Sequence, residues 1–177
     1  MAITYKLIAS TVTTGSSVTF SSIPATYTDL VIRASVGPEG FYNPSFDQFV
    51  RLWITTNASS GLISGTYIQG NGTTALSARE TETSWWQAGI FTQSNANSAN
   101  SVSSVEVYIP NYLNTSSKVM FANTTQENNT ANGDTTRVGD YAGLTRSTSA
   151  ITSITMIGTY AGIPAGSSFY LYGIKNS

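Results

Sequence analysis

Polar and apolar residues alternate over many short stretches of this chain, whereas apolar residues at helical spacing are hard to find. In SVEVYIP (104–110), for example, Val105, Val107 and Ile109 fall on one side. Successive side chains of a β-strand point to opposite faces, so this period of two predicts strands with one buried face. Pro110 should end this strand, because proline cannot donate a hydrogen bond to a neighbouring strand.

The same pattern, punctuated by Gly, Pro and Asn at turns, predicts about ten strands in all. They are expected over residues 3–12, 17–23, 28–36, 49–57, 62–69, 85–92, 104–110, 117–124, 151–160 and 168–174. Polar or Gly/Pro-rich loops are expected over 36–48, 92–104 and 124–137. Short strands at this spacing are typical of a sandwich or barrel, and we expect one antiparallel β-sandwich domain spanning 1–177.

The last predicted strand, 168–174, is apolar or amphipathic on both sides. Phe169 and Leu171 alternate with Tyr170, Tyr172 and Ile174. A strand with two such faces should lie inside a sheet or be covered on both sides. The sequence therefore predicts that this segment is held within the sandwich, as is the strand at 3–12.

Composition supports an all-β fold. Charged residues make up 10% of the chain, against about 25% in typical soluble domains, and Ser, Thr and Asn together supply 64 of the 177 residues. Residues that suit a pleated, half-buried surface are plentiful, whereas Glu and Lys, common on helix surfaces, are scarce. The hydrophobic fraction of 40% is sufficient for a core.

Charge and residue content exclude several classes of function. The formal net charge is −1 and the eight Lys and Arg residues are scattered, so we expect no nucleic-acid partner. With no His and no Cys, the chain lacks the Ser-His-Asp and Cys-His nucleophile arrangements and has no thiolate or histidine metal ligand. No apolar run approaches the length of a signal peptide core or a membrane helix. We expect no cofactor, no metal, no membrane partner and no enzymatic activity.

One segment combines carboxylates with tryptophans. Glu80 and Glu82 precede Trp85 and Trp86 in RETETSWW. Acids beside an indole ring can form a sugar-binding site, and two carboxylates facing each other can hydrolyse a glycosidic bond. The other interpretation is an exposed loop that leads into a strand, with one tryptophan inward and one outward.

A second candidate contact lies in the loop GFYNPSF, where Phe41, Tyr42 and Phe46 are the aromatic residues. Aromatic side chains are enriched at the centres of interfaces, so these three are candidates to contact a partner. The alternative is that they fold over the core of their own chain. The carboxylates near 132–134 and Asp140 do not have the spacing of a calcium loop.

Five Asn-x-Ser/Thr sequences occur in the chain. They begin at Asn57, Asn71, Asn114, Asn123 and Asn128. In a chain so rich in these three residue types, this number arises from composition alone. We therefore interpret them as composition and not as glycosylation sites.

Three segments together resemble a family of small virion structural proteins of tailed bacteriophages, many from marine or cyanobacterial hosts. Its members tend to begin with YxLI, to carry IPxTYTxL and to end in LYGIK. The matching residues here are Tyr5, Leu7, Ile8, Ile23, Pro24, Thr26, Tyr27, Thr28, Leu30, Leu171, Tyr172, Gly173, Ile174 and Lys175. The resemblance covers the two ends of the chain and not the segment 40–165. It implies a jelly-roll-like sandwich from a virion, and it carries over no binding residue.

The resemblance and the composition together lead us to expect a capsid decoration, or cement, protein. Such a protein would sit on the outer capsid surface as a homotrimer and clamp neighbouring copies of the major capsid protein. The alternative is the knob of a tail fibre or spike that binds host glycan, for which Trp85 and Trp86 would be the candidate residues.

Overall fold

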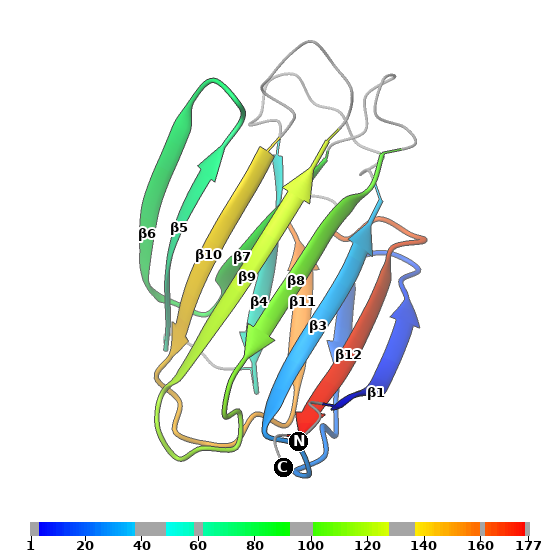
Figure 1. The fold of residues 1–177 in the computed structure, drawn as a ribbon, viewed down its shortest axis with the longest axis vertical. Coiled ribbons are helices and arrows are strands. Elements are labelled where there is room, and N and C mark those ends of the chain that lie inside the picture. Colours follow the sequence, from blue (N-terminus) through cyan, green and yellow to red (C-terminus); the bar gives the residue numbers. More distant parts are fainter. Residues whose placement is uncertain are drawn as a thin grey trace.

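The structure, a computed structural model, describes residues 4–37, 49–58, 62–92, 101–127, 137–159 and 162–175. Every regular element in these ranges is a β-strand (Figure 1). The strands are β1 (Thr4–Val12), β2 (Ser17–Phe20), β3 (Asp29–Val36), β4 (Phe49–Thr56), β5 (Ile63–Gly70), β6 (Ala75–Thr83), β7 (Trp86–Thr92), β8 (Ser103–Ile109), β9 (Lys118–Gln126), β10 (Arg137–Thr145), β11 (Ile154–Gly158) and β12 (Ser168–Lys175). No helix in these ranges is long and apolar enough to cross a membrane.

The strands form two packed sheets. The larger has the order β1-β12-β3-β8-β9-β10-β5-β6, and the smaller has the order β2-β11-β4-β7. Every strand pairing within them is antiparallel. In Figure 1 the larger sheet lies in front and the smaller sheet lies behind it. The predicted antiparallel β-sandwich is confirmed.

The chain order of the pairs is nested, as in a jelly roll. β1 pairs with β12, β2 with β11, β3 with β8, and β4 with β7. These four concentric pairs arise when one long antiparallel ribbon is wrapped into two sheets, which is the jelly-roll arrangement of eight strands. The remaining four strands are two inserted hairpins, β5–β6 and β9–β10, which pair with each other and extend only the larger sheet.

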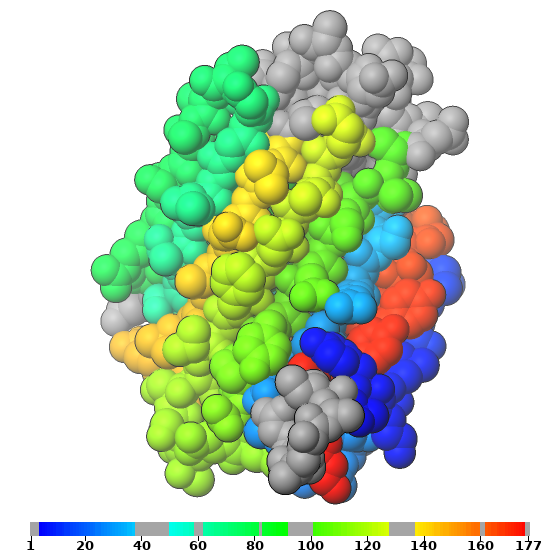
Figure 2. All heavy atoms as spheres, viewed as in Figure 1, coloured from blue at the N-terminus to red at the C-terminus, as the bar shows by residue number. Residues whose placement is uncertain are grey.

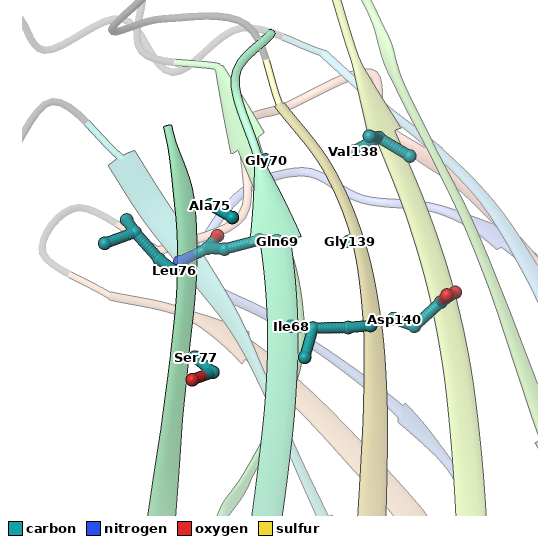
Figure 3. Close-up of a pocket in the computed structure, with 9 residues that line it drawn as sticks. All are labelled: Ile68, Gln69, Gly70, Ala75, Leu76, Ser77, Val138, Gly139 and Asp140. Atoms are coloured by element: carbon teal, nitrogen blue, oxygen red, sulfur yellow. The ribbon is translucent and has the colours of Figure 1, made fainter. Parts of the chain in front are cut away.

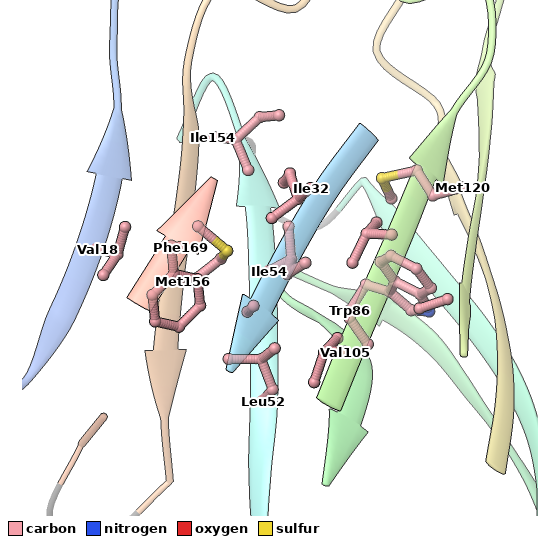
Figure 4. Packing of buried hydrophobic residues seen from close by; sticks show 14 of the residues in the cluster. Val18, Ile32, Leu52, Ile54, Trp86, Val105, Met120, Ile154, Met156 and Phe169 are labelled. Atoms are coloured by element: carbon pink, nitrogen blue, oxygen red, sulfur yellow. The ribbon is translucent and has the colours of Figure 1, made fainter. Parts of the chain in front are cut away.

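The space between the sheets is filled by one cluster of buried apolar side chains. Figure 4 shows Met156 and Ile154 of the smaller sheet near Phe169 and Ile32 of the larger one. The predicted alternation holds in β4, where Val50, Leu52 and Ile54 have no exposed surface, and in β8, which ends before Pro110. The alternating apolar positions therefore form the core.

The indole of Trp86 covers the inner side of the part of the larger sheet that the two inserted hairpins add to the nested pairs. Gly143 of β10 is directly paired with Gly65 of β5, and both lie under this ring. A Cβ atom added to Gly143 would be 2.6 Å from Cδ2 of Trp86, and one added to Gly65 would be 2.7 Å from Cδ1. The two glycines thus leave the space that the ring occupies, and Trp86 is 1% exposed.

The C-terminal strand β12 lies between β1 and β3, so the prediction that it is internal to a sheet is confirmed. Phe169 and Leu171 point into the core and have no exposed surface. On the opposite face Tyr170 is 39% exposed. Of the two expected arrangements, the strand therefore has the first, a place inside the sheet, and its outer face is not fully covered.

Two strands were not predicted, and one predicted loop overlaps the strands that flank it. Residues 75–83 form β6 and residues 137–145 form β10, whereas the predicted loop 124–137 overlaps the end of β9. In β10 the inward positions include Gly139 and Gly143. Without apolar side chains at these positions, the sequence shows no alternation of apolar and polar residues that would predict a strand. The strand β6 is an edge strand with mostly exposed side chains, so its sequence has no buried face and no apolar alternation that would predict a strand.

The first prediction concerns the two glycines, Gly65 and Gly143, against which the Trp86 ring packs. Replacing Gly143 with Ala should lower the free energy of unfolding by about 1–3 kcal/mol, because the added methyl group overlaps the indole ring. Urea denaturation measures this change. Gly70→Ala, also in β5–β10 contact, is the control, since its added Cβ would meet nothing nearer than 3.7 Å. Equal stability of the two variants would contradict this account.

The second prediction concerns alkaline stability. Burial raises the pKa of Tyr141, in the core part of β10, well above its ordinary value of 10.0. Above about pH 10 the unfolded chain therefore binds fewer protons than the folded chain, so stability is complete below this pH and falls as the pH rises further. Tyr141→Phe should lose less stability than the wild type between about pH 9 and about pH 11 in urea titrations. Identical pH slopes would count against it.

Candidate interaction surface

The outer face of the eight-stranded sheet, which points away from the smaller sheet, is the candidate interaction surface (Figure 2). Among the described residues, eleven large hydrophobic side chains are substantially exposed, and the strand registers place eight of them on this face. The eight are Tyr5, Leu7, Val12, Ile68, Val119, Phe121, Val138 and Tyr170. Grouped exposure of this kind marks contact surfaces more often than scattered single residues do.

The strand β9 shows most clearly that this exposure is built into the sequence. Its burial alternates without interruption, and the outward positions hold Val119 (56% exposed) and Phe121 (47% exposed). The inward positions hold the apolar Met120 and Ala122 together with the polar Lys118, Thr124 and Gln126. A strand that exposes a valine and a phenylalanine while it buries a lysine departs from the usual alternation of apolar inside and polar outside. Packing inside the chain therefore does not account for the two apolar residues.

Lys118 is accommodated in the interior by two carbonyl groups. Its Nζ atom donates to the carbonyl oxygens of Ser116, at 3.0 Å, and Ser147, at 3.1 Å. Burial lowers the pKa of this amine. The ammonium group thus joins the turn before β9 to the segment after β10.

The half of the face formed by β9, β10 and β5 is termed here the apolar half, and it carries Ile68, Val119, Phe121 and Val138. Several hollows lie along it. One, of about 480 Å³, is lined by β5, β6 and β10, and Figure 3 shows Ile68 and Val138 beside it. Another, of about 380 Å³, lies beside Val119. A bond of 2.8 Å from Asn123 Nδ2 to Asp140 Oδ1 separates the apolar side chains into two groups.

The half formed by β1, β12, β3 and β8 is termed the tyrosine half. Tyr5 meets Tyr172 edge to face, with ring centroids 6.5 Å apart, and Tyr170 is stacked beside Tyr172 at the same separation. Next to these rings Arg33 Nε donates to Glu106 Oε2 at 2.7 Å. This hydrogen bond raises the pKa of Arg33, and both side chains are about half exposed.

A buried carboxylate, that of Asp29, binds the Tyr108 hydroxyl at the end of the tyrosine half where β3 begins. Asp29 is 4% exposed and accepts hydrogen bonds from the Tyr108 hydroxyl and from the Asn111 backbone N–H, both at 2.9 Å. Burial, together with this carboxylate, raises the pKa of Tyr108. The arrangement fixes the ring of Tyr108 on the outer face.

The two tryptophans proposed as a glycan contact have different surroundings. Trp86 points into the core and is not accessible to a partner, whereas Trp85, between β6 and β7, is half-buried. The interpretation that one tryptophan points inward holds, but the residues before them form a strand and not a loop. Glu80 is half-buried on β6, and burial raises its pKa. The side chain of Glu82 lies outside the described part of the chain.

The other predicted contacts are less informative. Phe41, Tyr42 and Phe46 lie outside the described residues. Asp140 is on the outer face, bonded to Asn123, whereas the segment 132–134 lies outside the described ranges. Within the described residues, no three or more carboxylates group together as metal ligands do.

The described Asn-x-Ser/Thr asparagines have structural partners. Asn57 Nδ2 donates to the Ala150 carbonyl oxygen at 2.7 Å, while its Oδ1 accepts from the backbone N–H of Thr152 at 2.8 Å. Asn71 Oδ1 accepts from the Thr74 backbone N–H at 2.7 Å. Such bonds are typical of asparagine in turns, where its side chain replaces a backbone partner. Of the other sites, Asn128 lies outside the described residues.

Comparison with known proteins gave no relative: neither the protein-family models nor the curated proteins contain a match to this chain.

The third prediction tests whether the apolar half is surface and not core. Phe121→Ser should change the free energy of unfolding by no more than about 0.5 kcal/mol, as for most surface substitutions. It should also reduce the binding of an apolar fluorescent dye to the folded protein. Met120→Ala is the matched control on the buried side of β9, and it should lower stability by about 2–5 kcal/mol. A comparable loss in both variants would refute the assignment.

Proposed function

We propose that this chain is a virion structural protein of a tailed bacteriophage that decorates the outer capsid surface. In this proposal it binds the major capsid protein as a homotrimer and stabilises the joints between capsid subunits. The apolar half of the larger sheet is the observation that carries the proposal, because it supplies exposed apolar side chains on a rigid sheet. The resemblance of both chain ends to a virion protein family supplies the identity of the partner.

The segments that carry the resemblance lie together in the fold. Residues 5–8 are in β1 and residues 171–175 are in the neighbouring β12, while residues 23–30 lead into β3 on the other side of β12. The ring of Tyr27 lies over Gly173, where an added Cβ would be 2.2 Å from its Cγ atom. The backbone N–H of Thr28 donates to the Ile174 carbonyl oxygen at 2.7 Å. The motif thus describes one corner of the sandwich.

The mechanism would be passive. Burying apolar surface against capsid subunits stabilises a contact by about 25 cal/mol for each Å² removed from water. Opposite charges play a small part in a chain of this composition, so the contact should depend weakly on salt. A clamp of this kind resists separation of the subunits under internal pressure without any chemical step.

The fourth prediction is that the double variant Val119→Asp, Phe121→Asp binds purified phage heads at least about tenfold more weakly than the wild type. Two carboxylates on the outward side of β9 would have to be desolvated at the contact. Co-sedimentation with heads measures the binding. Tyr170→Ala, on the tyrosine half of the same face, is the control and should bind as the wild type does. Unchanged binding by the double variant would remove this face from the contact.

Antibody-gold labelling of intact particles tests the location separately. Label spread over the head is expected, and sedimentation equilibrium of the free protein should give the mass of a trimer. Label confined to the tail would overturn the decoration role. In that case the alternative, a tail knob that binds host glycan, would replace it.

A further inference from the structure

A shallow hollow of about 370 Å³ lies on the tyrosine half of the outer face, over β12, β3 and β8. Tyr170 and Tyr172 form one side of it, and Arg33 and Glu106 form the other. The apolar half, which carries the proposed capsid contact, contributes no residue to this hollow. Any ligand here would be independent of that contact.

The aromatic side of the hollow is held in place by its neighbours. Tyr172 has Tyr170 stacked beside it and Tyr5 against its edge, each with ring centroids 6.5 Å apart. Such ring pairs have preferred geometries and contribute stability beyond the area they bury. All three rings come from strands of one sheet, so the hollow has a rigid aromatic border before any ligand arrives.

The polar side offers a donor and an acceptor next to each other. Arg33 uses its Nε–H for Glu106 Oε2, at 2.7 Å, and its guanidinium lies 5.6 Å from the centre of the Tyr5 ring. A guanidinium has five N–H donors and a carboxylate has two oxygens, so this bond leaves further donors and an acceptor atom on the pair. A hydroxyl group can accept from the first and donate to the second.

We propose that this hollow binds a neutral hexopyranose oligosaccharide. A pyranose ring has an apolar face of C–H groups, which fits an aromatic ring, and a rim of hydroxyl groups, which fits an adjacent donor and acceptor. Pockets that combine aromatic walls with a few placed polar groups are typical of small-ligand sites. Arg33 and Glu106 neutralise each other, so an anionic sugar gains little from Arg33 and is repelled by Glu106.

Single-stranded nucleic acid is the other ligand that stacks on aromatic rings beside arginine. Its binding grooves carry an excess of positive charge that follows the phosphate backbone. Here the one arginine is paired with a carboxylate, and the chain as a whole has a net charge of −1. The charge therefore favours the saccharide. This site also differs from the tryptophan pair, since Trp86 is buried in the core.

The test is binding of the full chain to an array of neutral glucans, galactans and mannans, with sialylated and sulfated glycans and single-stranded DNA as further probes. The wild type should retain at least one neutral glycan and neither the anionic glycans nor the DNA. Titration of that glycan against Tyr170→Ala and Glu106→Gln should give affinities at least about tenfold weaker. Both residues are exposed, so thermal unfolding should show that the variants remain folded.

The double variant Val119→Asp, Phe121→Asp is the matched control and should bind the glycan as the wild type does. It separates the two proposals, because it is expected to lose head binding while Tyr170→Ala loses the glycan. The saccharide site is overturned if the wild type binds no neutral glycan, if it prefers DNA or anionic glycans, or if Tyr170→Ala binds as well as the wild type. If Trp85→Ala were the only variant to lose binding, the proposal would also be overturned, because the glycan would then bind at Trp85 and not in this hollow.

Discussion

The packing of the Trp86 ring against Gly65 and Gly143 is the contact on which the architecture of the larger sheet depends. A nested eight-stranded sandwich has two sheets of equal width, whereas here one sheet is extended by the inserted strands. The buried side of that extension needs a cover, and β7 at the edge of the smaller sheet supplies it. A large flat ring can cover two strands at once only where both lack side chains. The glycine pair and the indole therefore act as one unit.

The extension also explains why the two halves of the outer face differ. The strands β1, β12, β3 and β8 belong to the nested pairs, and their outer face carries tyrosines and a compact ion pair, with Leu7 and Val12 on the edge strand β1. The strands β9, β10 and β5 come from the inserted hairpins, and their outer face carries aliphatic side chains and Phe121. Two contacts with different chemistry can therefore exist on one rigid sheet, with their boundary between β8 and β9.

The sequence predicted the parts of the fold in which side-chain character and burial agree. The alternation at 49–57 and 104–110 identified the core positions of β4 and β8 correctly, and Pro110 marked the end of β8. It failed at 137–145, where Gly139 and Gly143 occupy inward positions and Trp86 of another strand covers Gly143. It also failed to identify the outer face, because an exposed phenylalanine and a buried one look the same in a sequence. The available signal was in β9, where a lysine alternates in phase with Met120 and out of phase with Phe121, and it has meaning only once the facing sheet is known.

By itself, the sequence determined the all-β class, the position of most strands and the absence of histidine and cysteine side chains, because these depend on local period and on residue types. Only the tertiary structure decided the strand order, the burial of Trp86 and the separation of its neighbour Trp85 from the core. It also brought together Tyr5, Arg33, Glu106 and Tyr172, which lie far apart in the chain. The physical reason is that pairing between strands joins residues of distant sequence position, and the local pattern of one strand holds no record of its neighbours.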